Sequence, residues 1–348
     1  MSNEPLLAIT MGDPAGIGPE IVVRALARED IQRLCRPVVI GDARLLEVAC
    51  DITGVGLKVN RLRSVDNSQL NKDAINVVDL HNVDCEGLVV GQVSKMCGKA
   101  ALEYILTSID LARRHLVEAV VTGPIHKEAI ALAGCPHPGH TEIFATSTGT
   151  RDYAMMLIVG ELRVSHVTTH IPLAQVASHI RKERVLRVIE LTHEAMLSLG
   201  IANPRIAVAA LNPHASDGGL FGEEEAKEIE PAVECARSNN IRADGPIPPD
   251  TVFVKHASHE YDAVVAMYHD QGHIPLKLVG FRWDNEIGDF QSVSGVNVTL
   301  GLPIIRTSVD HGVAFDKAGT GCARAESLCE AIELAVTMCS RGPRANLV

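Results

Sequence analysis

Residues 6–28 read LLAITMGDPAGIGPEIVVRALAR and contain a strand, a loop and a helix start in one stretch. The apolar run 6–12 leads into a loop rich in glycine and proline, and Pro19 then stands where a helix can begin. Proline suits this position because the first helical turn leaves its N–H groups unpaired, and Glu20 adds a favourable charge. The stretch therefore predicts a strand followed by a helix.

The same alternation continues along all 348 residues. Seven more runs are rich in Val, Ile, Leu and Ala at both odd and even positions, which fits strands covered on both faces, as in parallel sheets. These runs span 37–42, 119–125, 153–160, 163–170, 205–214, 263–270 and 296–308. Helical patterns span 19–28, 100–118, 183–199, 223–237 and 325–339. Alternating strands and helices predict an α/β fold, and the length suggests about two domains.

Composition limits the class of protein. The formal net charge of −11 argues against nucleic acid or an anionic membrane as a partner. The amino-terminal residues do not resemble a signal peptide, and no apolar run reaches about 18 residues, so we expect no membrane span. Nine cysteines without a C-x-x-C pair are typical of reduced thiols, which favours the cytoplasm.

Histidines close three of the apolar runs: His170 in HVTTH, His214 in AALNPH and His269 in VAMYH. In open α/β sheets ligands bind beyond the carboxyl ends of the strands, so these three side chains can share one edge. Neutral imidazoles suit Zn²⁺, Co²⁺ and related ions, and three of them leave the open position that a catalytic metal needs. The alternative is that each histidine is a structural residue with its own hydrogen bond.

Four other residues have competing interpretations. Lys127 follows a strand end, where it could contact an anion, move a proton or be solvated. Asp250 could be a carboxylate near the metal or a helix cap. His166 is expected to be structural or exposed, and the glycine in HDQGH argues against His273 as the second ligand of a helical pair.

Several residues could bind anions. His140 and Thr141 stand at an expected helix start, a position that favours phosphate or carboxylate, although Thr141 could simply cap the helix. Lys277 and Arg306 could hold a phosphate, the arginine in bidentate fashion, or be ordinary surface charges. The glycine-rich run 306–321 would let the backbone approach a cofactor closely.

A resemblance to the PdxA family, the 4-hydroxythreonine-4-phosphate dehydrogenases, extends from Leu6 to Met338. It is carried by the motifs MGDPAGIGPE, TGPIHKEA, GHTEIFA, VTTHIPL, LNPHASDGGLFGEEE, PPDTVF, YHDQGHIPLKL and GVNVTLGLPIIRTSVDHG. RDYAMMLIVGELRVSHVTTH and GHIPLKLVGF look closer to the branch of the family that acts on 4-phospho-D-threonate or 4-phospho-D-erythronate.

The resemblance implies an isocitrate/isopropylmalate-dehydrogenase-like fold with two α/β/α domains and an interdomain cleft. Residues 1–128 plus 300–348 would form the cofactor-side domain, and residues 129–299 the central domain for metal, substrate and dimerisation. It implies a homodimer whose interface completes each site. It also implies an NAD- or NADP-linked oxidation of the C3 hydroxyl followed by loss of CO₂, with one divalent metal (Zn, Co, Mg or Mn) per site.

The resemblance assigns roles to individual residues. The metal ligands would be His170, His214 and His269. The substrate contacts would be His140, Thr141, Lys277, Asn297 and Arg306. The cofactor loop would include His311, Gly312, Asp316, Gly319 and Gly321. Either Lys127 or Asp250 could move the proton.

One departure from the family pattern is the stretch 281–294, FRWDNEIGDFQSVS, which is roughly ten residues longer than expected and could be a lid or a surface loop. The substrate therefore has alternatives. The chain could act on 4-phosphooxy-L-threonine in pyridoxine biosynthesis, or on a cis-dihydrodiol carboxylate. A zinc-stabilised binding protein without turnover is the non-enzyme alternative.

Overall fold

The computed structural model describes residues 4–284 and 289–341, which form two compact units. Unit 1 holds residues up to 151 together with 302–340, and unit 2 holds residues 152–301 together with Arg341. Residues 129–151, which the sequence places in the central domain, group with unit 1. The α/β fold class is confirmed in both units.

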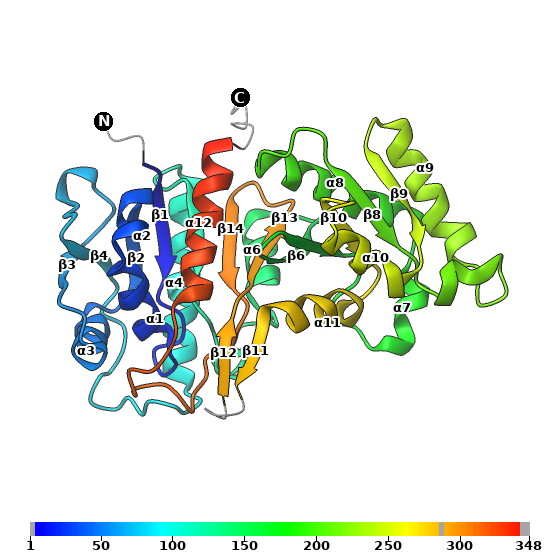
Figure 1. The fold of residues 1–348 in the computed structure, drawn as a ribbon. Coiled ribbons are helices and arrows are strands. Elements are labelled where there is room, and N and C mark those ends of the chain that lie inside the picture. Colours follow the sequence, from blue (N-terminus) through cyan, green and yellow to red (C-terminus); the bar gives the residue numbers. More distant parts are fainter. Residues whose placement is uncertain (1–3, 285–288, 342–348) are drawn as a thin grey trace. The chain divides into compact units, whose positions relative to one another are not determined.

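Unit 1 is built on a parallel sheet with the strand order β3-β4-β2-β1-β5-β14 (Figure 1). Its strands are β1 (Leu6–Thr10), β2 (Arg36–Gly41), β3 (Lys58–Leu62), β4 (Ala74–Asp79), β5 (Ala119–Thr122) and β14 (Ile305–Val309). Its helices are α1 (Gly18–Leu26), α2 (Glu29–Leu34), α3 (Ala43–Thr53), η1 (Asn67–Gln69), α4 (Lys95–Arg113), α5 (Lys127–Leu132), α6 (His140–Thr148) and α12 (Glu326–Arg341). The central strand β1 is fully buried, as its unbroken apolar run predicts.

Unit 2 contains a mixed sheet with the order β13-β6-β7-β10-β8-β9. Its strands are β6 (Ala154–Val159), β7 (Leu162–His166), β8 (Arg205–Ala209), β9 (Arg242–Ile247), β10 (Ala263–Ala266) and β13 (Val296–Leu300). Its helices are α7 (Leu173–His179), α8 (Lys182–Ser198), η2 (Pro213–Asp217), η3 (Glu225–Ile229), α9 (Glu230–Ser238), α10 (Pro249–Ala257) and α11 (His269–Gly280). Four neighbouring strands run parallel to one another: β7, β10, β8 and β9. The three histidines predicted to bind metal follow strands in this half of the sheet.

The structure corrects the expectation of purely parallel pairing. Strands β6 and β7 are antiparallel, because Val159 and Leu162 pair across a two-residue turn whose Gly160 has φ 56°. The run 296–308 also forms two strands, which separate at Gly301 with φ 85°. The edge strand β3 was missed because KVNRL is largely polar, and only Leu62 is buried.

The stretch 281–294 contains two short antiparallel strands, β11 (Phe281–Asp284) and β12 (Asp289–Val293). Residues 285–288 lie outside the described residues, so the expected lid or surface loop stays a prediction. Within the described ranges, every helix is too short or too polar to cross a bilayer.

Candidate functional site

The three predicted metal-binding histidines follow three adjacent strands of unit 2. His170 comes four residues after β7, His269 three residues after β10, and His214 five residues after β8. Strand β10 lies between β7 and β8, and both pairings are parallel. Because parallel neighbours end at the same edge of a sheet, all three histidine segments begin at one edge.

The side chains of the three histidines are not equally close to one another. The ring centroids of His170 and His269 are 5.7 Å apart. The ring nitrogens of His170, His214 and His269 are not all within 4.8 Å of one another, as far as the described residues show. The structure therefore brings two of the three predicted ligands together and places the third in the neighbouring segment.

Two further histidines join this group. His166 ends β7 and is fully buried, and its Nε2 lies 3.2 Å from Nδ1 of His273. The ring of His273 stacks on His269 at 3.8 Å. Burial, aided by neighbouring histidines, lowers the pKa of His166 to about 3 and that of His273 to about 4. Both rings are therefore neutral at pH 7, as metal-binding imidazoles must be.

The expectation that the glycine in HDQGH prevents a helical pair is wrong. Helix α11 begins at His269 and continues through Gly272 to Gly280, so His269 and His273 lie one turn apart on one face. A Cβ at Gly272 would collide with Nε2 of His166. The glycine is therefore explained by the close approach of α11 to β7, and the i, i+4 spacing of the two histidines correctly indicated a helix.

Buried side chains connect the three strand ends. Thr168, just after β7, donates from Oγ1 to the carbonyl oxygen of Met267, just after β10, at 2.8 Å. Gln271 accepts from Met267 N–H at 2.6 Å and donates from Nε2 to the Ala210 carbonyl, just after β8, at 2.8 Å. These bonds fix the relative positions of the backbone segments from which the histidines project.

The segment that begins at His214 has an unusual backbone conformation. His214, Ala215, Ser216 and Asp217 all have positive φ, a conformation that L-residues rarely adopt in succession. The buried carboxylate of Glu225 accepts from the backbone N–H groups of residues 211 and 212 at 2.9 and 2.7 Å. The strained residues thus follow a stretch of backbone that a buried acceptor anchors, and strain of this kind is typical of functional segments.

Three of the residues predicted to bind an anion, His140, Thr141 and Arg306, lie in unit 1. Arg306 on β14 is 3% exposed and donates from Nε and Nη2 to Thr122 Oγ1, and its guanidinium lies 5.6 Å from the Phe144 ring. Burial lowers the pKa of Arg306 to about 9, although Glu142 opposes the shift, so the side chain is charged at pH 7. Glu142 stands in the first turn of α6, the helix that begins with His140 and Thr141.

His140 lies within the electrostatic influence of Arg306. Burial, followed by the charge of Arg306, holds the pKa of His140 well below its usual range, so its ring is neutral. Its Nε2 is buried and has no hydrogen-bond partner among the described residues. The two other predicted substrate contacts, Lys277 on α11 and Asn297 on β13, belong to unit 2.

The predicted proton-transfer residues are both exposed. Lys127 is the first residue of α5 in unit 1, directly after His126, whose Nδ1 accepts from Ala129 N–H. Asp250 stands in the first turn of α10 in unit 2. Helix α10 contacts η2, the segment that carries His214.

The predicted cofactor loop is held by the first helix of unit 1. Gly319 N–H donates to the buried carboxylate of Glu20, and Arg24 donates to the Gly321 carbonyl. Both glycines have positive φ, 78° and 69°. The remaining members of the loop, His311, Gly312 and Asp316, lie between β14 and these turns. The MGDPAGIGPE motif therefore supports the loop, a role that its sequence did not suggest.

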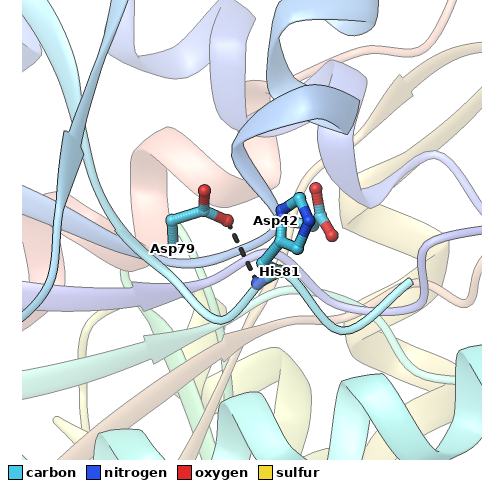
Figure 2. A group of neighbouring side chains, drawn as sticks. All are labelled: Asp42, Asp79 and His81. Atoms are coloured by element: carbon cyan, nitrogen blue, oxygen red, sulfur yellow. Dashed lines mark hydrogen bonds between the residues drawn. The ribbon is translucent and has the colours of Figure 1, made fainter. Parts of the chain in front are cut away.

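A separate group of possible metal ligands lies in unit 1. Asp42, Asp79 and His81 place one ligand atom each within 4.8 Å of the others (Figure 2). Arg44 binds both carboxylate oxygens of Asp42, and Asp79 accepts from the N–H groups of residues 43 and 81. Because protein donors already engage both carboxylates, this group fits a metal ion less well than the neutral histidines.

Comparisons with known proteins identify the family of the chain. The family model described as pyridoxal phosphate biosynthetic protein PdxA matches residues 33–335. The D-threonate 4-phosphate dehydrogenase of Cupriavidus necator is 44% identical over 338 residues, which cover 97% of this chain and 98% of that protein.

Two 4-hydroxythreonine-4-phosphate dehydrogenases are similarly related. That of Desulforapulum autotrophicum is 45% identical over 334 residues, which cover 96% of this chain and 95% of that protein. The crystal structure of the Klebsiella pneumoniae protein aligns with a TM-score of 0.82 and 42% identity, covering 97% of this chain and 99% of that one. The chain therefore belongs to the PdxA family of dehydrogenases.

Proposed function

We propose that this chain oxidises the C3 hydroxyl of 4-phospho-D-threonate or 4-phospho-D-erythronate with NAD⁺ or NADP⁺, and that the β-keto acid product then loses CO₂. The observation that carries the proposal is the hydrogen-bonded connection of the strand ends leading to His170, His214 and His269. The Cupriavidus necator relative, which is named for D-threonate 4-phosphate, supports this class of substrate.

The donor set suits a divalent ion such as Zn²⁺, Co²⁺, Mg²⁺ or Mn²⁺, with His170, His214 and His269 as its ligands. The imidazoles of His166 and His273 lie beside His269, with ring centroids 6.3 and 3.8 Å away, and burial keeps both neutral, so neither places a positive charge next to a bound cation. When bound, the ion supplies Lewis-acid stabilisation of charge on the C3 oxygen, and the nicotinamide supplies the hydride acceptor.

The residues of unit 1 would bind the ends of the substrate and the cofactor. The Arg306 guanidinium and the Thr141 hydroxyl would hold the phosphate. A phosphate oxygen would also give His140 Nε2 the hydrogen-bond partner that it lacks among the described residues. The loop from His311 to Gly321 would hold the adenosine side of the cofactor. Lys277 and Asn297 of unit 2 would contact the substrate. Either Lys127 of unit 1 or Asp250 of unit 2 would accept the hydroxyl proton.

The second candidate substrate is 4-phosphooxy-L-threonine. The Desulforapulum autotrophicum relative, at 45% identity, favours it. The purified chain should be supplied with each phosphorylated acid, either nicotinamide cofactor and one divalent metal, and followed by the absorbance of the reduced cofactor. Fastest turnover of 4-phospho-D-threonate or 4-phospho-D-erythronate supports the proposal, whereas preference for 4-phosphooxy-L-threonine contradicts it.

A homodimer is part of the proposal. Unit 2 exposes large apolar side chains next to the site, including Leu173 at 71%, Ile274 at 66% and Leu278 at 80%. Exposed apolar groups of this kind mark association surfaces. Light scattering should give twice the chain mass, and Leu278→Glu should shift the chain toward monomer, while a monomeric parent protein would contradict this part.

A further inference from the structure

We infer that Gln271 is a positioning residue that sets the distance between His214 and His269, and this inference rests on the proposed metal site. Gln271 belongs to α11, two residues beyond His269 in the first turn. The residue is 8% exposed, so most of its side chain lies inside unit 2.

The amide of Gln271 bonds to two strand ends at once. Its Oε1 accepts from Met267 N–H at 2.6 Å, two residues before His269. Its Nε2 donates to the Ala210 carbonyl at 2.8 Å, four residues before His214. The side chain therefore spans from the β10 end to the β8 end, and both amide groups are used.

Other bonds make this connection rigid. The Met267 carbonyl accepts a hydrogen bond from Thr168 Oγ1, and the Ala210 N–H donates to the Ile247 carbonyl at 2.8 Å. Glu225 holds the next two N–H groups after Ala210. A change at Gln271 would therefore remove the side-chain link between the two segments that follow β8 and β10, while the strands themselves stay paired.

The substitution Gln271→Met tests the inference, because methionine fills a similar volume and makes neither hydrogen bond. Thr192→Val is the matched control: Thr192 is fully buried in unit 2 and bonds Ser165 Oγ and the Val188 carbonyl, so it does not connect the segments that follow β8 and β10. Metal-free full-length protein is titrated with Co²⁺ against a chromophoric chelator, and the visible spectrum of bound Co²⁺ is recorded.

We expect Gln271→Met to weaken Co²⁺ binding by about 10- to 100-fold, the range seen when groups that orient ligands are removed, and to change the visible bands. Thr192→Val should keep the parent affinity and spectrum. If Gln271→Met does not fold, Gln271→Glu takes its place, since it keeps the acceptor for Met267 N–H and loses the donor to Ala210.

The two possible failures can be told apart. Parent protein that binds no Co²⁺, or that binds it equally well after His269→Ala, refutes the metal site itself. Parent protein whose Co²⁺ binding needs His269, together with a Gln271→Met variant of unchanged affinity and spectrum, overturns the inference and leaves the proposed function standing.

Discussion

The imidazole rings of His269 and His273 stack with their centroids 3.8 Å apart and an interplanar angle of 9°. The stack fixes the plane of the His269 ring, because His273 is itself held by His166 Nε2 and by the His269 carbonyl. A proposed ligand is thus oriented before any metal arrives, which reduces the ordering that binding must supply.

Substitution of His214 should remove metal binding without unfolding the chain. His214 is exposed and has φ 55°, a conformation that asparagine tolerates, so His214→Asn should change the free energy of unfolding by no more than about 0.5 kcal/mol. Loss of one ligand should weaken metal binding by at least about 100-fold. Metal titration and denaturant unfolding measure the two effects, and a variant that retains activity under strong chelation would contradict the assignment.

Removal of the buried guanidinium should selectively weaken the binding of phosphorylated substrates. Arg306→Ala takes away a charged donor, and such hydrogen bonds contribute about 1.5–3 kcal/mol, so KM should rise by about 10- to 100-fold. Unphosphorylated analogues provide the control because they lack the group that Arg306 would bind. An equal loss with phosphorylated and unphosphorylated acids would show that Arg306 has another role.

Gly272 should not tolerate a side chain. Gly272→Ala would force α11 away from His166, and overpacking of this kind costs about 1–3 kcal/mol, more than the helix propensity that alanine gains. Gly56→Ala is the control, since a Cβ there meets nothing within 4 Å. Urea unfolding midpoints compare the two variants; similar midpoints for both would refute the close approach of α11 to β7.

Acid should destabilise the protein partly through His256. This buried ring accepts from Arg163 N–H, and burial lowers its pKa below the usual 6.5. The unfolded chain therefore binds a proton at His256 near pH 6.5, whereas the folded chain binds this proton only at lower pH. Its contribution to stability is complete above pH 6.5 and falls as the pH drops from there toward the folded pKa.

His256→Gln keeps an acceptor for Arg163 N–H but does not titrate. Below pH 6.5 its free energy of unfolding should fall less steeply than that of the parent, by up to about 1.4 kcal/mol per pH unit. Unfolding curves at several pH values measure the slopes. Parallel slopes for parent and variant would show that the pKa of His256 is the same in the folded and unfolded chain, which would contradict the prediction.

The positions of the three histidines after strand ends were predictable from the sequence, but the tertiary contacts around them were not. The ends of HVTTH, AALNPH and VAMYH identify residues that do follow adjacent strands, because buried apolar runs locate parallel strands well. His166 was missed because RVSHVTTH gives no sign of where β7 ends. The inward turn of Gln271 and the support of Gly319 by Glu20 depend on contacts between distant segments, which local patterns do not contain.

The central claim is that three imidazoles bind one divalent ion, and anomalous diffraction from crystals grown with Zn²⁺ tests it most directly. The account predicts one strong peak per chain, with ring nitrogens of His170, His214 and His269 at about 2.0–2.1 Å. A peak beside Asp42 and Asp79 with none at these histidines would contradict it.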